Sequence, residues 1–100
     1  MAADGSFSLD RAVPGTLAVS GTLGFATAAA ALQALDEALR AGDRSRIDLA
    51  GVRASDSAGL ACVLAVRAEA CRRGRPVGLQ NVPEGMRTLA QVSGVDALLA

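Results

Sequence analysis

Hydrophobic and polar positions along the chain follow two different periods. Alternating positions and short apolar runs beside turn residues predict strands over Phe7–Arg11, Thr16–Ser20, Arg46–Val52 and Pro76–Val82. Apolar positions three to four residues apart, and apolar runs too long for a strand, predict helices over Phe25–Arg40, Ser57–Arg73 and from Pro83 to about Ser93, with a last turn over Val95–Leu99.

Residues that start and stop helices stand where these periods change. We expect Thr27, or an earlier residue, to cap the first helix and Gly42 to end it. Asp56 is the expected N-cap of the second helix, and Gly74 suits the position just past its end. Pro83 fits the first turn of the third helix, where its missing N–H costs nothing.

The order of these elements predicts an α/β fold. Two strands joined by the turn residues Val13–Gly15 form an opening hairpin, and strands then alternate with helices. This order predicts a mixed, mostly parallel sheet of about four strands with helices packed on it. One hundred residues are enough for one core, so we expect one domain over 1–100, with residues 1–5 disordered.

Charge and composition narrow the classes of partner. Ten arginines, no lysines and ten acidic residues leave a formal net charge of zero, and only two residues are aromatic. A nucleic-acid-binding face usually needs surplus cations and stacking side chains, so nucleic acid is not expected. No apolar stretch approaches the roughly 18 residues of a membrane span, and the start lacks the pattern of a signal peptide. We therefore expect a cytoplasmic protein.

The chemistry available to the chain is limited because it contains no histidine. Histidine-based triads and the usual zinc-binding spacings are thereby excluded. Cys62 and Cys71 lie nine residues apart on one predicted helix, about 13 Å along its axis, so they cannot form a disulfide. Both are interpreted as small residues in or near a core. No metal or cofactor is expected.

An enzyme is not expected either. Catalysis needs a convergent nucleophile, base and oxyanion donors, and the only candidates are Asp48, Asp56, Ser57 and Glu84. Asp48 lies within a predicted strand, and Glu84 fits the first turn of a helix without any catalytic role. We therefore assign no catalytic residue.

The stretch "ASDSAGLACVLA", residues 54–65, places small polar residues directly before an apolar helix. If Asp56 is the N-cap, Ser57 is the first helical residue, at the positive end of the helix dipole. A phosphate added there would be favoured by the dipole and by free N–H groups, and opposed by the charge of Asp56. Ala58 and Gly59 would let another protein approach the backbone closely. The alternative is that Asp56 and Ser57 only cap the helix.

Several motifs resemble the STAS domain family. "IDLAGVRASDSAGLACVLAVRAEACRRGRPVGLQNV" is similar to its strand, its D-S/T-x-G loop, the helix after that loop and the next strand. "GTLAVSGTL" resembles the family's second strand, and "PEGMRTLAQVSGVDALL" resembles its third helix and close. The resemblance covers Leu9 to Leu99. It is closest to the MlaB-like type, the STAS subunit of Mla phospholipid transporters.

The resemblance implies a protein that works by binding. An MlaB-like subunit would bind and stabilise or regulate the cytoplasmic ATPase of a phospholipid ABC transporter, peripheral to the inner membrane through that partner. The predicted partner-binding residues are Ser55, Asp56, Ser57, Ala58, Gly59 and Leu60. The alternative is an anti-sigma-factor antagonist switched by phosphorylation at Ser57 by an anti-sigma factor kinase. Ala58 departs from the second Ser or Thr of the phosphorylated class, which favours a constitutive contact.

Four arginines near the end of the second predicted helix leave a similar choice open. Cations at or past a helix C-terminus complement its negative dipole end. They could instead pair with acidic groups on a partner. The residues are Arg67, Arg72, Arg73 and Arg75.

Overall fold

The computed structural model describes residues 6–42 and 44–99, and the expectation for residues 1–5 lies outside these ranges. The elements in chain order are β1 (Phe7–Asp10), β2 (Thr16–Leu23), α1 (Ala28–Ala41), β3 (Arg46–Ser55), α2 (Ser57–Arg72), β4 (Gly78–Gln80), α3 (Glu84–Val92) and a 3₁₀ turn, η1 (Asp96–Leu99).

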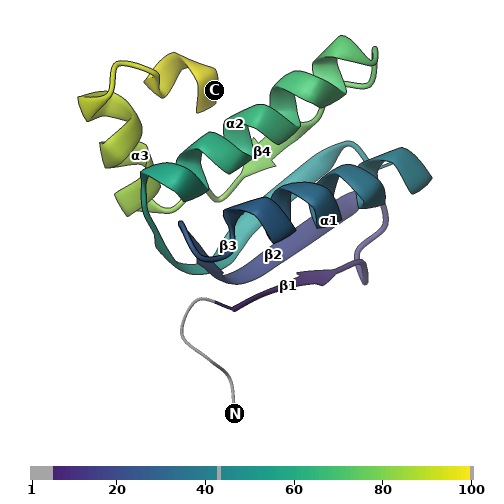
Figure 1. Ribbon diagram of the computed structural model, residues 1–100. Coiled ribbons are helices and arrows are strands. Elements are labelled where there is room, and N and C mark those ends of the chain that lie inside the picture. The colour runs from purple at the N-terminus through teal and green to yellow at the C-terminus, as the bar shows by residue number, and fades with distance from the viewer. Residues whose placement is uncertain (1–5, 43, 100) are drawn as a thin grey trace.

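One four-stranded sheet in the order β1-β2-β3-β4 organises the fold. β1 runs antiparallel to β2, whereas β2–β3 and β3–β4 are parallel pairs. The predicted α/β class and the mixed, mostly parallel sheet are therefore confirmed. Helices α1 and α2 lie side by side on one face of this sheet, and α3 lies at one end of the molecule (Figure 1).

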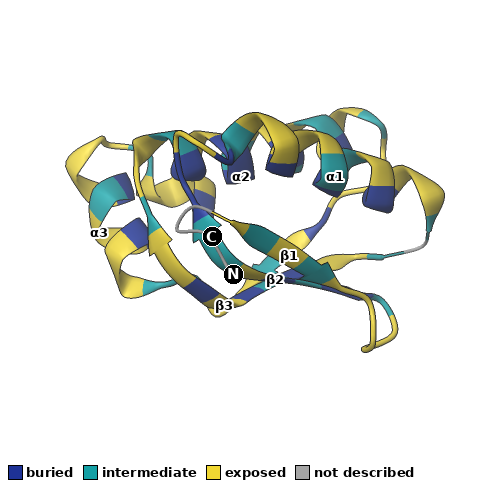
Figure 2. Ribbon diagram, turned by 60° about the horizontal axis from the view of Figure 1, so that its bottom comes forward, coloured by how far each residue is buried: buried dark blue, intermediate teal, exposed yellow. Residues whose placement is uncertain are grey.

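The core lies between the sheet and these two helices. Burial alternates along β3, where Ile47 and Leu49 are buried and face the helices, while Ala50 is exposed. Figure 2 shows the buried positions turned toward the interior and an exposed outer side of the sheet. The largest fully buried side chains are Leu17, Leu23, Leu35, Ile47, Leu49, Met86, Val19, Val63 and Val66.

β2 and β3 each extend three residues further than their hydrophobic patterns predict. β2 continues three residues past Ser20, with register shifts between Ala18 and Ser20 and between Gly21 and Thr22. Gly21 has φ +95°, and a side chain at this position would overlap the Ser6 carbonyl. The bulge therefore needs glycine, which breaks the alternation that predicts a strand.

The first helix begins three residues later than predicted. Residues 24–27 form a turn in which the amides of Thr27 and Ala28 donate to the carbonyl of Gly24. Thr27 stands at the N-cap position, but its hydroxyl accepts from the Gly24 amide instead of capping the helix. Phe25 therefore belongs to the turn before α1 and not to the predicted helix, and its side chain is exposed.

The predicted end of α2 is confirmed. Gly74 has φ +78°, its amide donates to the carbonyl of Cys71, and the amide of Arg75 donates to that of Ala70. This pair of bonds is a Schellman motif, which favours glycine just past the helix.

Among the described residues, no helix is long and apolar enough to cross a membrane.

Candidate functional site: the N-terminal end of helix α2

Asp56 caps α2 as the sequence predicts. One carboxylate oxygen, Oδ1, accepts from the amides of Ala58 and Gly59 at 2.9 and 3.1 Å. These two amides are therefore occupied and are not free to bind a phosphate on Ser57. A phosphate there would compete with Asp56 for the same donors.

Asp56 also binds a second segment. Its other oxygen, Oδ2, accepts from the amide of Phe25 at 3.0 Å, across 31 residues of sequence. This hydrogen bond, followed by those from Gly59 and Ala58, lowers the pKa of the exposed Asp56 carboxyl. The carboxylate is charged at neutral pH and joins the turn before α1 to the start of α2.

The six predicted partner-binding residues differ in exposure. Asp56 and Ser57 are exposed, and Ser55 and Ala58 are partly exposed. Gly59 and Leu60 are buried, and a Cβ at Gly59 would overlap the carbonyl oxygen of Leu23. The packing of α2 directly over the end of β2 therefore requires a glycine at position 59, whether or not a partner binds there. The surface formed by this stretch consists mainly of residues 55–58.

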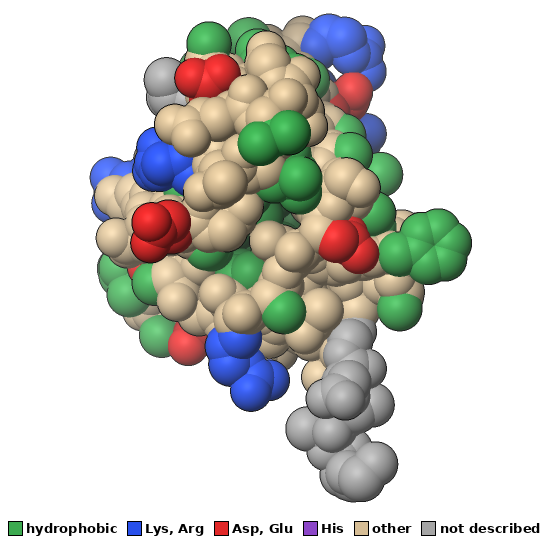
Figure 3. All heavy atoms as spheres, turned by 90° about the vertical axis from the view of Figure 1, so that its left-hand side faces the viewer, with side chains coloured by type: hydrophobic (Ala, Val, Ile, Leu, Met, Phe, Trp, Pro, Cys, Tyr) green, Lys and Arg blue, Asp and Glu red, His purple; other side chains and the backbone are tan. Residues whose placement is uncertain are grey.

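An apolar groove of about 460 Å³ adjoins this surface. It runs between the N-terminal halves of α1 and α2. The lining residues are Phe25, Ala28, Ala29 and Leu32 on one side and Ala58, Ala61, Cys62 and Ala65 on the other. Figure 3 looks at the end of the molecule where these helices begin, and hydrophobic side chains reach the surface there between the charged groups.

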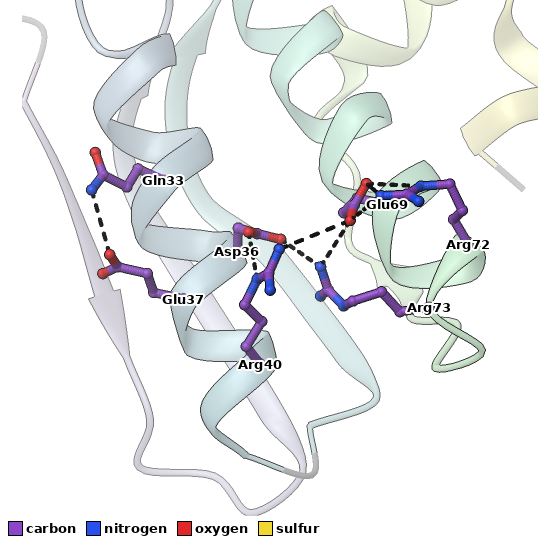
Figure 4. Close-up of polar contacts among 7 residues, drawn as sticks. All are labelled: Gln33, Asp36, Glu37, Arg40, Glu69, Arg72 and Arg73. Atoms are coloured by element: carbon purple, nitrogen blue, oxygen red, sulfur yellow. Dashed lines mark hydrogen bonds and ion pairs between the residues drawn. The ribbon is translucent and has the colours of Figure 1, made fainter.

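Ion pairs join the C-terminal halves of the same two helices (Figure 4). Arg73, the C-cap residue of α2, donates to Asp36 on α1 at 2.8 Å and lies 3.4 Å from Glu69. Arg40 pairs with Asp36 at 2.9 Å, and Arg72 binds Glu69. These contacts hold α1 and α2 together beyond the groove.

The four arginines near the end of α2, for which the sequence left open a role at the helix end or a pairing with a partner's acids, all have hydrogen-bond partners within the chain. Arg72 and Arg73 belong to this ion-pair network. Arg67 donates to the carbonyl of Leu98 at 2.7 Å, and Arg75 donates to that of Gly42 at 3.4 Å. Internal hydrogen bonds therefore account for their positions without an external acid.

The other polar candidates do not converge on the α2 cap. The Asp48 carboxylate on β3 accepts from the side chain of Asn81 and from the amide of Ala50, and these bonds lower its pKa. Asp48 therefore serves a contact between β3 and the loop after β4. Within residues 6–42 and 44–99, no group of three or more acidic or cysteine side chains could hold a metal ion.

Comparison with known proteins identifies the family. The family model described as "Mlab, STAS domain" matches residues 8–100. The chain belongs to the MlaB-type STAS domain family. No curated protein sequence is significantly similar to this STAS domain.

Solved structures confirm the fold of this STAS domain. The anti-sigma factor antagonist SpoIIAA in its unphosphorylated form superimposes with a TM-score of 0.69 at 21% identity, covering 93% of this chain and 84% of that chain. The Bacillus cell fate determinant SpoIIAA in the phosphorylated form gives 0.65 at 22% identity, covering 93% and 87%. At this identity the likeness concerns the fold alone.

Phe25 is the site residue that sequence reasoning missed. The sequence predicts it as the first residue of the first helix and gives it no role in a site. In the structure it is 88% exposed and lines the groove. Leu32 on α1 is 39% exposed and lines the groove too. Only the turn held by Asp56 reveals this surface.

Proposed function

We propose that this STAS domain is a non-enzymatic subunit that binds and stabilises or regulates the cytoplasmic ATPase of a phospholipid ABC transporter. Membership of the MlaB-type family is the observation that carries the proposal. The ATPase subunit is the direct partner, and the protein lies in the cytoplasm, at the inner membrane only through that partner. No cofactor takes part.

The docking face consists of the exposed or partly exposed residues 55–58 and the adjoining apolar groove. A helix on a protein surface usually carries polar residues on its outer side. From Ser57 to Val66, α2 has no charged residue, and its exposed positions include Ala61 and Ala65. A smooth apolar surface of this kind suits close packing against another protein.

Ser57 marks the polar edge of this face. It is the first residue of α2 and is exposed, so a large side chain there would project into any partner seated on the helix N-terminus. Ser93, exposed at the C-cap of α3, offers a matched position at a different helix end.

Co-expression of the tagged STAS domain with the candidate ATPase subunit tests the proposal. Wild type and Ser93→Arg should recover equal amounts of ATPase, whereas Ser57→Arg should recover at most a small fraction of that amount. Equal recovery with Ser57→Arg would count against the docking face. Failure of the wild type to recover the ATPase would count against the function.

A second candidate function is an anti-sigma-factor antagonist switched by phosphate on Ser57. It is supported by the exposure of Ser57 and by the fold shared with SpoIIAA, which has also been solved in its phosphorylated form. It is disfavoured by Asp56, which already occupies the Ala58 and Gly59 amides. Incubation with the cognate anti-sigma kinase and ATP, followed by intact mass, separates the two functions, because no added phosphate removes this candidate.

A further inference from the structure

Phe25 is the most exposed large hydrophobic side chain among the described residues, at 88%. The other phenylalanine, Phe7, packs against the core. An exposed phenylalanine ring forgoes the burial that aromatic side chains usually contribute to folding. The ring stands at the rim of the groove, with Ala58 among the other lining residues.

The backbone that carries this ring is held in place from two sides. The Phe25 amide donates to Asp56, and the preceding amide of Gly24 donates to the hydroxyl of Thr27 at 2.9 Å. Thr27 is only 5% exposed and donates in turn to the carbonyl of Thr22 at 2.9 Å. An aromatic side chain on such a fixed turn loses little backbone freedom when it enters a partner.

The Asp56 carboxylate beside the ring has no ion-pair partner within residues 6–42 and 44–99. Within the described residues, the ion pairs involve only Asp36 and Glu69 as acids, and no arginine pairs with Asp56. The positive end of the α2 dipole offsets the Asp56 carboxylate in part. A partner that receives the ring therefore meets an exposed negative charge bonded to the Phe25 backbone, next to the groove, which favours a cation on the partner.

We infer that Phe25 is the aromatic anchor of the docking face, that Asp56 is the positioning residue that holds it, and that the ATPase receives the ring in an apolar socket edged by a lysine or arginine. The inference rests on the proposed function and adds which side chain dominates the contact. Buried aromatic anchors are the residues that most often dominate protein interfaces.

Affinity for the purified ATPase tests the anchor. Phe25→Ala should weaken binding by about 30-fold or more, which is the effect of removing an interface hot spot. The matched control is Val92→Ala on α3, which removes an 81% exposed hydrophobic side chain and should change the affinity by less than about threefold. Both side chains are exposed, so neither variant should alter the circular dichroism spectrum.

A double-mutant cycle tests the positioning role. Asp56→Asn should weaken binding clearly in the wild-type background and much less in the Phe25→Ala background, because it acts through the ring. In the Asp56→Asn variant, the backbone amide of Phe25 should also exchange its hydrogen with solvent faster than in the wild type. Raising the salt concentration should weaken binding of the wild type more than binding of Asp56→Asn.

The outcomes separate the two proposals. If Ser57→Arg abolishes binding and Phe25→Ala does not weaken it, the docking face stands and the anchor is wrong. If the effects of Phe25→Ala and Asp56→Asn on the binding free energy simply add, Asp56 is not a positioning residue. If the wild type does not bind the ATPase at all, the proposed function fails, and the anchor fails with it.

Discussion

Replacing Gly59 by alanine tests how tightly α2 is seated on the sheet. The new Cβ would lie 2.7 Å from the carbonyl carbon of Leu23 and 3.1 Å from its Cβ, and would overlap its carbonyl oxygen. That oxygen also accepts from the amide of Asp56 at 3.3 Å. Because the obstacle is strand backbone, the helix itself must move outward.

The expected cost follows from two opposing effects. Inserting a methyl group into a packed contact of this kind costs about 1–3 kcal/mol, and the upper part of the range applies because backbone cannot rotate away. Alanine regains at most about 1 kcal/mol of helix propensity. Gly59→Ala should therefore lower the free energy of unfolding by about 2 kcal/mol, which is a fall of about 8–16 °C in Tm for a chain of this size.

Thermal and urea unfolding followed by circular dichroism measure this difference. The matched control is Gly85→Ala in α3, where an added Cβ meets nothing within 4 Å. This variant should be as stable as the wild type or more stable by up to about 1 kcal/mol. A Gly59→Ala protein as stable as Gly85→Ala would refute the close seating of α2 on β2.

Two further predictions concern acid stability and thiol reactivity. Hydrogen bonds from Arg73 and Arg40 lower the pKa of Asp36 below 3.8, and that from Arg72 lowers the pKa of Glu69 below 4.5. Their stabilisation is therefore present above those ordinary pKa values and is lost as pH falls through the lowered ones, so urea unfolding of Asp36→Asn should show less loss of stability than the wild type between pH 6 and pH 3. A colorimetric thiol reagent should modify the exposed Cys71 at once and the buried Cys62, whose pKa is raised by burial, only at the rate of opening or unfolding. Rapid modification of two thiols per folded chain would contradict this burial.

The kinds of element were predictable because each has its own hydrophobic period. The strand Arg46–Ser55 and the helix from Ser57 begin where the sequence predicts, since alternation and a strong N-cap mark those points. The strand ends were less predictable. Residues 53–55 continue β3 although none of them is buried, because they pair with β2.

The surface of the candidate site was only partly predictable, because one of its features follows from local sequence and another depends on a long-range contact. The exposed start of α2 follows from local sequence, because Asp56 binds amides two and three residues away. The exposure of Phe25 does not, because it depends on a hydrogen bond across 31 residues. The local sequence predicts Phe25 as part of the first helix, whereas the structure places it in a turn held by local bonds at Gly24 and Thr27 and by the contact with Asp56.

The central claim is that a partner docks on the start of α2 and the groove beside it. The most direct test places a photo-crosslinking amino acid at Ala61, exposed in this groove, or at Ala50, exposed on the opposite side of the sheet. Illumination of cells that also express the ATPase should crosslink it to position 61 and not to position 50. Crosslinks to the ATPase from position 50 alone would contradict the account.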